Sequence, residues 1–385
     1  MIGSAVRMNA GHAWLLVLLI ASQATTAQDP KLKTRTKEER EALYASTHRI
    51  TLNVQVTDSA GNPVSDLAAG DFTIYDNQQP RKISAFHAID GAGMYDATRV
   101  VILLDAVNSP AQALDAGKNG IFKYLAQSRG PLSSPTSFAL WFNGHLDTTA
   151  ATIDRNSVGR AFVKMTKGVH SNACNTDTDP TQQKVTMRTG SGNADAATCR
   201  AVHFRDSIAA LEGIALEQQA GGGRTLLIWV GTGWPTISEE EFQRLPPKNQ
   251  REYAQEIVSL TRDLRASQVT LYSISPADRD QDGKAPDPPI EVLASSQASA
   301  QTPNTVARHL ALHELSQRTG GRVIAASDDI AADVGSCVRD ASWYYAVSFN
   351  APPAQNGPGE VHLLAIKVNR PDLQVRTMTT YYSEP

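Results

Sequence analysis

The order of apolar and polar residues divides the chain into two kinds of segment. Every second residue from Ile50 to Val56 is apolar, which is the period-two pattern of a strand with one buried face. From residue 99 onward the apolar residues instead form unbroken runs, of which 100–104 is the first. Such runs are typical of parallel strands that are covered on both faces. The pattern therefore predicts a β-rich segment over 47–92 and an α/β segment over 97–341.

Within the α/β segment, apolar runs alternate with stretches of helical spacing. Further runs lie at 138–142, 226–230, 269–274 and 323–326, and the helical stretches between and after them include 158–165, 208–216, 306–318 and 329–340. Alternation of buried strands with amphipathic helices predicts an α/β fold with a doubly wound, mostly parallel sheet.

After residue 342 the chain returns to a strand-like pattern. Strands are expected at 344–349, 361–368 and 375–382. Neither β-rich end has enough strands to be stable alone. We therefore predict that 47–92 and 342–385 pack together as one small β-sandwich beside the α/β segment.

The first 27 residues have the pattern of a secretory signal peptide. Arg7 and His12 precede an apolar run at 13–21, and small residues follow before Gln28, where cleavage is expected. This run is about half of the roughly 20 apolar residues that span a bilayer, so a membrane anchor is the weaker interpretation. A charged leader occupies 28–46. We expect a secreted, periplasmic or envelope protein with no stable membrane span.

Charge and cysteine content add two points. The net charge of −3 gives no reason to expect nucleic acid or an anionic membrane surface as a partner. Cys174 and Cys199 lie at the two ends of a polar segment, and in an oxidising compartment a disulfide between them would close this loop. Cys337 lies in a helical pattern and is expected to be a small buried apolar residue.

Candidate functional residues follow two of the buried strands, where open α/β sheets bind ligands. Asp105, Asn108 and Ser109 come after the first apolar run, and Thr232 and Trp234 come after 226–230. Asp105 is either a metal or partner contact or an acceptor for neighbouring loop amides. Asn108 is expected to contact a partner, and Trp234 is either an exposed anchor for a partner or a residue packed beneath the adjacent loop.

Together, several short motifs resemble the von Willebrand factor type A fold and, more narrowly, the VWFA-related proteins of acidobacterial secretomes. The resemblance covers roughly 48–382, and it rests on the order of Val54–Thr57, Gly70-Asp71-Phe72, Leu103-Leu104-Asp105, Arg224–Val230, Thr319–Arg322 and Tyr344-Tyr345. It implies an adhesion-type binding protein that uses the loops at one edge of the sheet.

The resemblance also implies a damaged cation site. In the type A fold, an Asp-x-Ser-x-Ser motif joins a Thr and an Asp from later loops around a divalent ion. Asp105 and Ser109 match the first and last positions, but Val107 replaces the middle Ser and Thr232 replaces the later Asp. The loop Thr would be Thr189 or Thr198. A site with a single carboxylate is expected to bind Mg²⁺ only weakly.

A second candidate metal site is an acidic turn. Asp278, Asp280 and Asp282, followed by Gly283, match the opening of a calcium-binding loop. The twelfth position is Pro289 instead of Glu, although Asp287 or Glu291 could substitute. An acidic turn within a flexible loop is the competing interpretation.

The common enzyme motifs are absent from the sequence, including the Gly-x-Ser-x-Gly elbow, His-Glu-x-x-His and the phosphate loop. His309 and His313 share a helix face but lack a third ligand, so we expect them on the surface. We predict no catalytic residue and favour a protein whose loop rim binds a protein or glycan. The alternatives are a metal-dependent hydrolase using Asp105 and a structural envelope protein with a vestigial site.

Overall fold

The computed structural model describes residues 49–91, 98–174, 196–221, 223–234, 246–276, 312–352, 354–355 and 359–383. All of these belong to one compact unit of the chain. The expected signal peptide, the charged leader, Thr189, His309 and the acidic turn at Asp278, Asp280 and Asp282 lie outside the described residues. No helix in the described ranges is both long and apolar enough to cross a bilayer.

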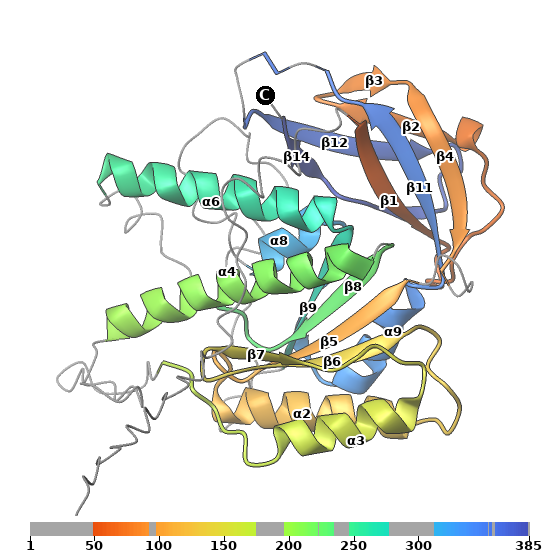
Figure 1. Ribbon diagram of the computed structural model, residues 1–385. Coiled ribbons are helices and arrows are strands. Elements are labelled where there is room, and N and C mark those ends of the chain that lie inside the picture. The colour runs from red at the N-terminus through yellow and green to blue at the C-terminus, as the bar shows by residue number, and fades with distance from the viewer. Residues whose placement is uncertain are drawn as a thin grey trace, which may run out of the picture. The chain divides into compact units, whose positions relative to one another are not determined.

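Six strands form a central sheet in the order β10-β9-β8-β5-β6-β7 (Figure 1). The strands are β5 (Arg99–Asp105), β6 (Thr136–Phe142), β7 (His145–Thr148), β8 (Thr225–Val230), β9 (Val269–Pro276) and β10 (Val323–Ser327). All pairings are parallel except that of β6 with β7, which is antiparallel. The expected mostly parallel sheet is therefore present, and its strand order reverses between β5 and β8.

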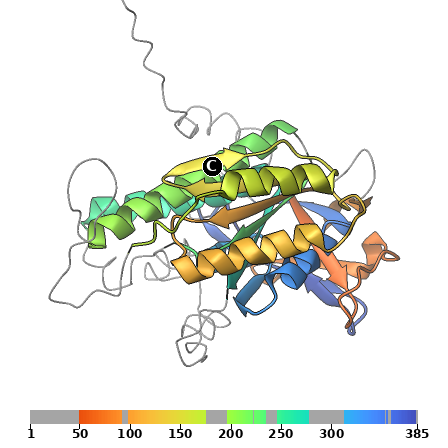
Figure 2. The ribbon, with the colours of Figure 1, turned by 90° about the horizontal axis from the view of Figure 1, so that it is seen from below.

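Helices cover both faces of this sheet. On one side are α2 (Ala111–Ala126), α3 (Arg155–Thr166) and α9 (Ile330–Arg339), and Figure 2 shows α2 and α3 side by side on that face. On the other side are α4 (Ala196–Gly221), α6 (Pro247–Ala266) and α8 (Leu312–Arg318). Along β5, Ile102 packs with the first group and its neighbour Leu103 with the second. Burial of both faces explains why the strand sequences are unbroken apolar runs.

Two four-stranded antiparallel sheets contain strands from both ends of the chain, in the orders β13-β1-β11-β4 and β14-β12-β2-β3. The early strands are β1 (Arg49–Thr57), β2 (Phe72–Asp76), β3 (Gln79–Arg81) and β4 (Ile83–Asp90), and a 3₁₀ turn, η1 (Ala69–Asp71), precedes β2. The late strands are β11 (Trp343–Asn350), β12 (Val361–Val368), β13 (Gln374–Arg376) and β14 (Thr380–Tyr382). We call these two sheets the β module.

The two ends of the chain are joined by direct strand pairing within the β module. Leu52 on β1 lies opposite Val347 on β11, and Ile74 on β2 lies opposite Ile366 on β12. Side chains of both sheets share one apolar core. The expectation that the terminal β segments pack together is thus met by interleaved strands.

Several elements differ from the sequence-based expectation. The strand predicted at 375–382 is two short strands, β13 and β14, which belong to different sheets, because the chain crosses the core at the buried residue Met378. Helix α4 begins at Ala196, well before its predicted start at 208. Strand β7 was not predicted, because its short polar sequence carries no period-two apolar pattern.

A buried charged cluster joins the β module to the α/β sheet. The Asp340 carboxylate, just after α9, accepts hydrogen bonds from Arg376 on β13 at 2.8 Å and from Tyr272 on β9 at 3.1 Å. Its backbone carbonyl accepts from Arg224 at 3.1 Å, and the Arg224 guanidinium lies 4.6 Å from the centroid of the Tyr344 ring. Burial and the Asp340 charge raise the pKa of Tyr272, so its hydroxyl stays a donor.

Candidate functional site

Asp105 organises the turn between β5 and α2. Its Oδ1 accepts from the backbone N–H groups of Val107 at 3.0 Å and Asn108 at 2.9 Å. Its Oδ2 accepts from Asn108 Nδ2 at 2.8 Å and from Trp229 Nε1 on β8 at 3.0 Å. The side chain is 0% exposed. Asp105 therefore fixes the loop backbone and ties it to the neighbouring strand.

The surroundings of Asp105 suit a carboxylate that is already fully hydrogen-bonded. Burial raises the pKa of Asp105, and the four hydrogen bonds oppose that shift. All four partners are N–H donors. A cation could reach either oxygen only by displacing these donors. With these hydrogen bonds in place, Asp105 does not suit a resident Mg²⁺ or Ca²⁺ ion. The weak Mg²⁺ site that the resemblance implied at Asp105, Ser109 and Thr232 would need a different arrangement of the loop.

Ser109 and Thr232 contact each other next to the Asp105 loop. The Thr232 backbone N–H donates to Ser109 Oγ at 3.3 Å, and Thr232 Oγ1 donates to the Asn108 carbonyl at 3.2 Å. A Cβ at Gly231 would fall 2.7 Å from Asp105 Cβ and 2.8 Å from Ser109 Oγ. The ends of β5 and β8 thus meet closely at the point where the strand order reverses, which is the usual ligand edge of such sheets.

Asn108 and Trp234 are not accessible partner contacts, which corrects the sequence-based expectation. They are 8% and 6% exposed. Asn108 Nδ2 also donates to Ser207 Oγ on α4 at 3.0 Å, and the Trp234 ring meets Trp229 edge-on with centroids 5.1 Å apart. The early start of α4 and the placement of α8 beside Gly233 cover these positions. For Trp234, the alternative of packing beneath its surroundings is the one observed.

The accessible part of this edge comes from neighbouring turns. Asn143, in the turn between β6 and β7, is exposed and accepts a hydrogen bond from the Asn172 side chain. The Asn172 backbone N–H donates to the Ala106 carbonyl at 2.9 Å, so its segment runs along the Asp105 loop. His170 is exposed and Thr232 is half-buried. We call Asn143, His170, Asn172 and Thr232 the rim.

The predicted disulfide between Cys174 and Cys199 is present, with a Cα–Cα distance of 6.0 Å. It joins the segment that carries His170 and Asn172 to the first turns of α4. Cys337 is free and buried, as expected, and burial raises the pKa of its thiol to about 12.

His203 is a candidate ligand that sequence reasoning missed. Its Nδ1 lies 3.3 Å from Cys174 Sγ and its Nε2 lies 3.9 Å from Cys199 Sγ. Burial lowers the pKa of His203, and the Asp206 charge opposes this shift. The spacing of Cys199 and His203, four residues apart, could have indicated a shared helix face, but the helix was expected only from 208.

Two other candidate metal ligands, Thr198 and His313, lie on helices. Thr198, one of the two suggested loop ligands, is exposed on the first turn of α4. His313 is half-buried on α8 instead of exposed. Neither position supports the metal interpretation.

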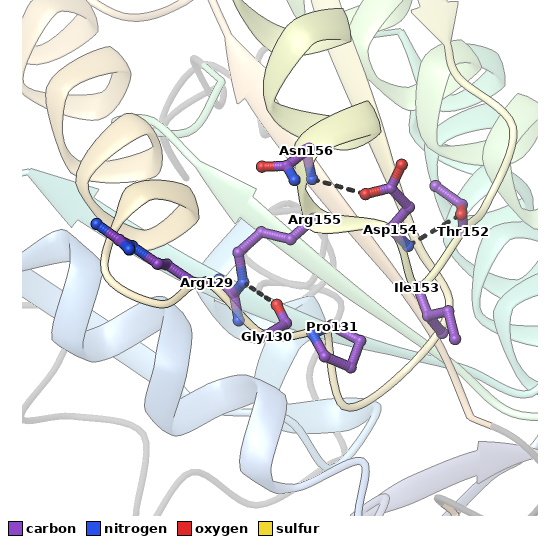
Figure 3. Close-up of a pocket in the computed structure, with 8 residues that line it drawn as sticks. All are labelled: Arg129, Gly130, Pro131, Thr152, Ile153, Asp154, Arg155 and Asn156. Carbon is purple, nitrogen blue, oxygen red and sulfur yellow. Dashed lines mark hydrogen bonds between the residues drawn. The ribbon is translucent and has the colours of Figure 1, made fainter.

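A small pocket lies at the opposite edge of the sheet. Its volume is about 310 Å³, and it is formed by the loop before β6 and the start of α3 (Figure 3). Arg155 Nε donates to the Gly130 carbonyl at 3.1 Å, and the Asp154 side chain caps α3. These polar groups are engaged with the protein itself, and the pocket is separate from the rim.

No protein-family model matches the chain, and no curated protein matches it. Among solved structures, it is similar to proximal thread matrix protein 1 from the mussel byssus, with 10% identity and a TM-score of 0.33, over 68% of this chain and 50% of that one. It is also similar to the human COPII-coat protein Sec24c, with 7% identity and a TM-score of 0.31, over 74% and 43%. A third similar structure is the manganese-loaded Plasmodium vivax TRAP protein, with 10% identity and a TM-score of 0.29, over 76% and 96%.

The chain thus spans half the length of the first of these structures and less than half of the second. At these TM-scores the similarities carry no argument about family or function.

Proposed function

We propose that this protein is an adhesion-type binding protein of the von Willebrand factor type A-like class, acting outside the cytoplasm. The rim at the carboxyl edge of the parallel sheet would contact a protein or glycan partner. The disulfide between Cys174 and Cys199 is consistent with an extracytoplasmic location.

The observation that carries the proposal is the hydrogen-bonded organisation of the rim. Asp105 holds the β5–α2 loop through four bonds, and that loop in turn accepts bonds from Asn172 and Thr232. Polar side chains held in fixed positions lose less conformational entropy on binding. A preorganised polar surface at the reversal of strand order is the arrangement expected for recognition.

The same geometry favours binding over hydrolysis. A nucleophilic Asp must reach the substrate, and Asp105 has no exposed surface while each of its oxygens accepts two N–H donors. The rim side chains are amides, a hydroxyl and an exposed imidazole, which suit hydrogen bonding to a polar partner. We therefore propose a non-catalytic role that needs no ion at Asp105.

The proposal is tested by capturing partners from an extracellular or envelope extract and by screening a glycan array. The rim variant is His170→Glu with Asn172→Glu. Its matched control is Ile153→Glu with Asn156→Glu at the opposite edge, which adds the same two negative charges to exposed positions. We expect the rim variant to weaken binding at least about 10-fold, a loss of about 1.4 kcal/mol, and the control to bind like wild type.

Two results would contradict the proposal. One is equal binding by the rim variant and wild type. The other is turnover of generic phosphate or ester substrates that Asp105→Asn abolishes while the variant remains folded, which would favour the hydrolase.

A further inference from the structure

One cluster of metal-ligating atoms lies next to the rim, outside the Asp105 network. The two sulfurs of Cys174 and Cys199 and a ring nitrogen of His203 all lie within 4.8 Å of one another. Cys199 and His203 are one helical turn apart on α4, so their side chains leave the same face of the helix. Cys174 approaches from the segment that follows α3.

The positions of these atoms are close to those of a tetrahedral zinc site. Zn–S bonds of about 2.3 Å and Zn–N bonds of about 2.0–2.1 Å place neighbouring ligand atoms roughly 3.5 Å apart. His203 Nδ1 lies 3.3 Å from Cys174 Sγ, close to this value, whereas the 3.9 Å distance to Cys199 Sγ belongs to the other ring nitrogen, Nε2. Because the ion takes only one ring nitrogen, the two sulfurs must separate and the imidazole must turn, and breaking the bond between the sulfurs frees both side chains to do so.

We propose that Cys174, Cys199 and His203 form a redox-gated Zn²⁺ site, in which the disulfide form excludes the ion and the dithiol form binds it. Thiolate and imidazole ligands are the set that Zn²⁺ prefers. Three protein ligands leave a fourth position for water.

The chemistry balances with a dithiol as the reductant. A dithiol transfers two electrons and two protons to the Cys174–Cys199 disulfide, which becomes two thiols, while the reductant becomes a disulfide. Zn²⁺ then displaces the two thiol protons, which pass to solvent, and binds both thiolates and one nitrogen of His203. In the reverse direction, a small-molecule disulfide accepts two electrons from the thiolates and two protons from solvent to become a dithiol, the Cys174–Cys199 bond forms again and the ion is released.

As a consequence, the segment that carries His170 and Asn172 would stay linked to α4 in both redox states, through the disulfide or through the ion. Beside Cys174, Ser171 Oγ donates to the Ser109 carbonyl at 2.6 Å. On the α4 side, Ser207 Oγ accepts from Asn108 at 3.0 Å. Either cross-link therefore holds both neighbours of the Asp105 loop together. This inference does not depend on the partner proposed for the rim.

The test uses the full chain, reduced with dithiothreitol, desalted without oxygen and titrated with Co²⁺ and then Zn²⁺. We expect a thiolate-to-cobalt charge-transfer absorption that Zn²⁺ removes, one Zn²⁺ per reduced chain by calorimetry, and no binding by the oxidised chain. His203→Ala keeps the disulfide and should bind Zn²⁺ at least about 10-fold more weakly. The matched control is His145→Ala, at an exposed position on β7.

Several outcomes would overturn the inference: no charge-transfer absorption in the reduced chain, equal Zn²⁺ binding by the oxidised chain, or equal affinity in His203→Ala. If reduction unfolds the chain, circular dichroism decides the question. Zn²⁺ should restore the folded spectrum to wild type and fail to restore it in Cys174→Ser, and failure with wild type would also overturn the inference.

Discussion

Replacing Asp105 by Ala should destabilise the folded chain strongly, because the substitution leaves four buried N–H donors without an acceptor. These are the backbone amides of Val107 and Asn108, the Asn108 side chain and the Trp229 indole. Leaving a buried donor unsatisfied costs about 1–3 kcal/mol. Removing the buried charge and admitting a water molecule both offset part of this. We expect a net loss of about 3–5 kcal/mol in the free energy of unfolding.

Asp105→Asn should destabilise the folded chain less than Asp105→Ala does. The Asn oxygen can still accept from the two backbone amides, but its NH₂ group faces the Asn108 and Trp229 donors. Two donors are then unsatisfied instead of four, so the expected loss is about 2 kcal/mol. Wild type, Asp105→Asn and Asp105→Ala should therefore fall in that order of stability.

The assay is urea unfolding followed by circular dichroism and tryptophan fluorescence, with midpoints compared at a constant slope. The matched control is Asp115→Ala on α2, since that side chain is 69% exposed and pairs only with Lys118, at 3.4 Å, among the described residues. Such a substitution should stay within about 0.5 kcal/mol of wild type. Two results together would refute the structural role of Asp105. One is a change in the free energy of unfolding of Asp105→Ala as small as that of the control. The other is a heat of Mg²⁺ binding that wild type shows and Asp105→Ala lacks, which would make the carboxylate an ion ligand.

Three further predictions concern packing and charge. Gly231→Ala should lower the free energy of unfolding by more than about 2 kcal/mol through overpacking. Gly159→Ala on α3, with nothing within 4 Å of the added Cβ, should raise it by about 0.5–1 kcal/mol. Equal melting temperatures of the two variants would contradict this. Because burial raises the pKa of Asp105 in the folded state, its contribution to stability is full below the unfolded pKa of about 3.9 and is lost as pH rises through the folded pKa. The stability advantage of wild type over Asp105→Asn should therefore shrink as pH rises, and an advantage that grew would disprove it. Asp340→Asn should lower the free energy of unfolding by about 3–5 kcal/mol, since it leaves the Arg376 charge without its partner. A loss below about 1 kcal/mol, measured by urea unfolding, would refute this prediction.

Much of the fold was predictable because burial leaves a direct signature in sequence. Both faces of β5 and β8 are covered, so the strands are unbroken apolar runs, and one face of β1 is buried, so its apolar residues alternate. The pairing of the two chain ends also followed from a physical need, since few strands cannot form a stable sheet alone. Elements without such a signature, such as β7, were missed.

Less of the candidate site was predictable, because burial of a polar residue depends on elements far away in sequence. Asn108 follows a strand and carries an amide, which is what a rim contact would require, yet α4 covers it through Ser207. Trp234 follows β8 in the same way, yet it packs against Trp229. The accessible rim includes His170 and Asn172, in a segment that the sequence presents only as polar loop.

The residue at position 229 decides what Asp105 can do. A motif after a parallel strand supplies a carboxylate at the ligand edge, but the neighbouring strand determines whether its oxygens remain available. Here β8 places an indole N–H 3.0 Å from Oδ2, where it completes the set of four donors. A side chain without a donor at 229 would leave one oxygen with a free lone pair facing the end of β8, which is the position a cation would need. We therefore expect Trp229 to limit ion binding at Asp105, and Mg²⁺ calorimetry of Trp229→Phe beside wild type tests this: a heat of binding gained by the folded variant would support it, and no gain would contradict it.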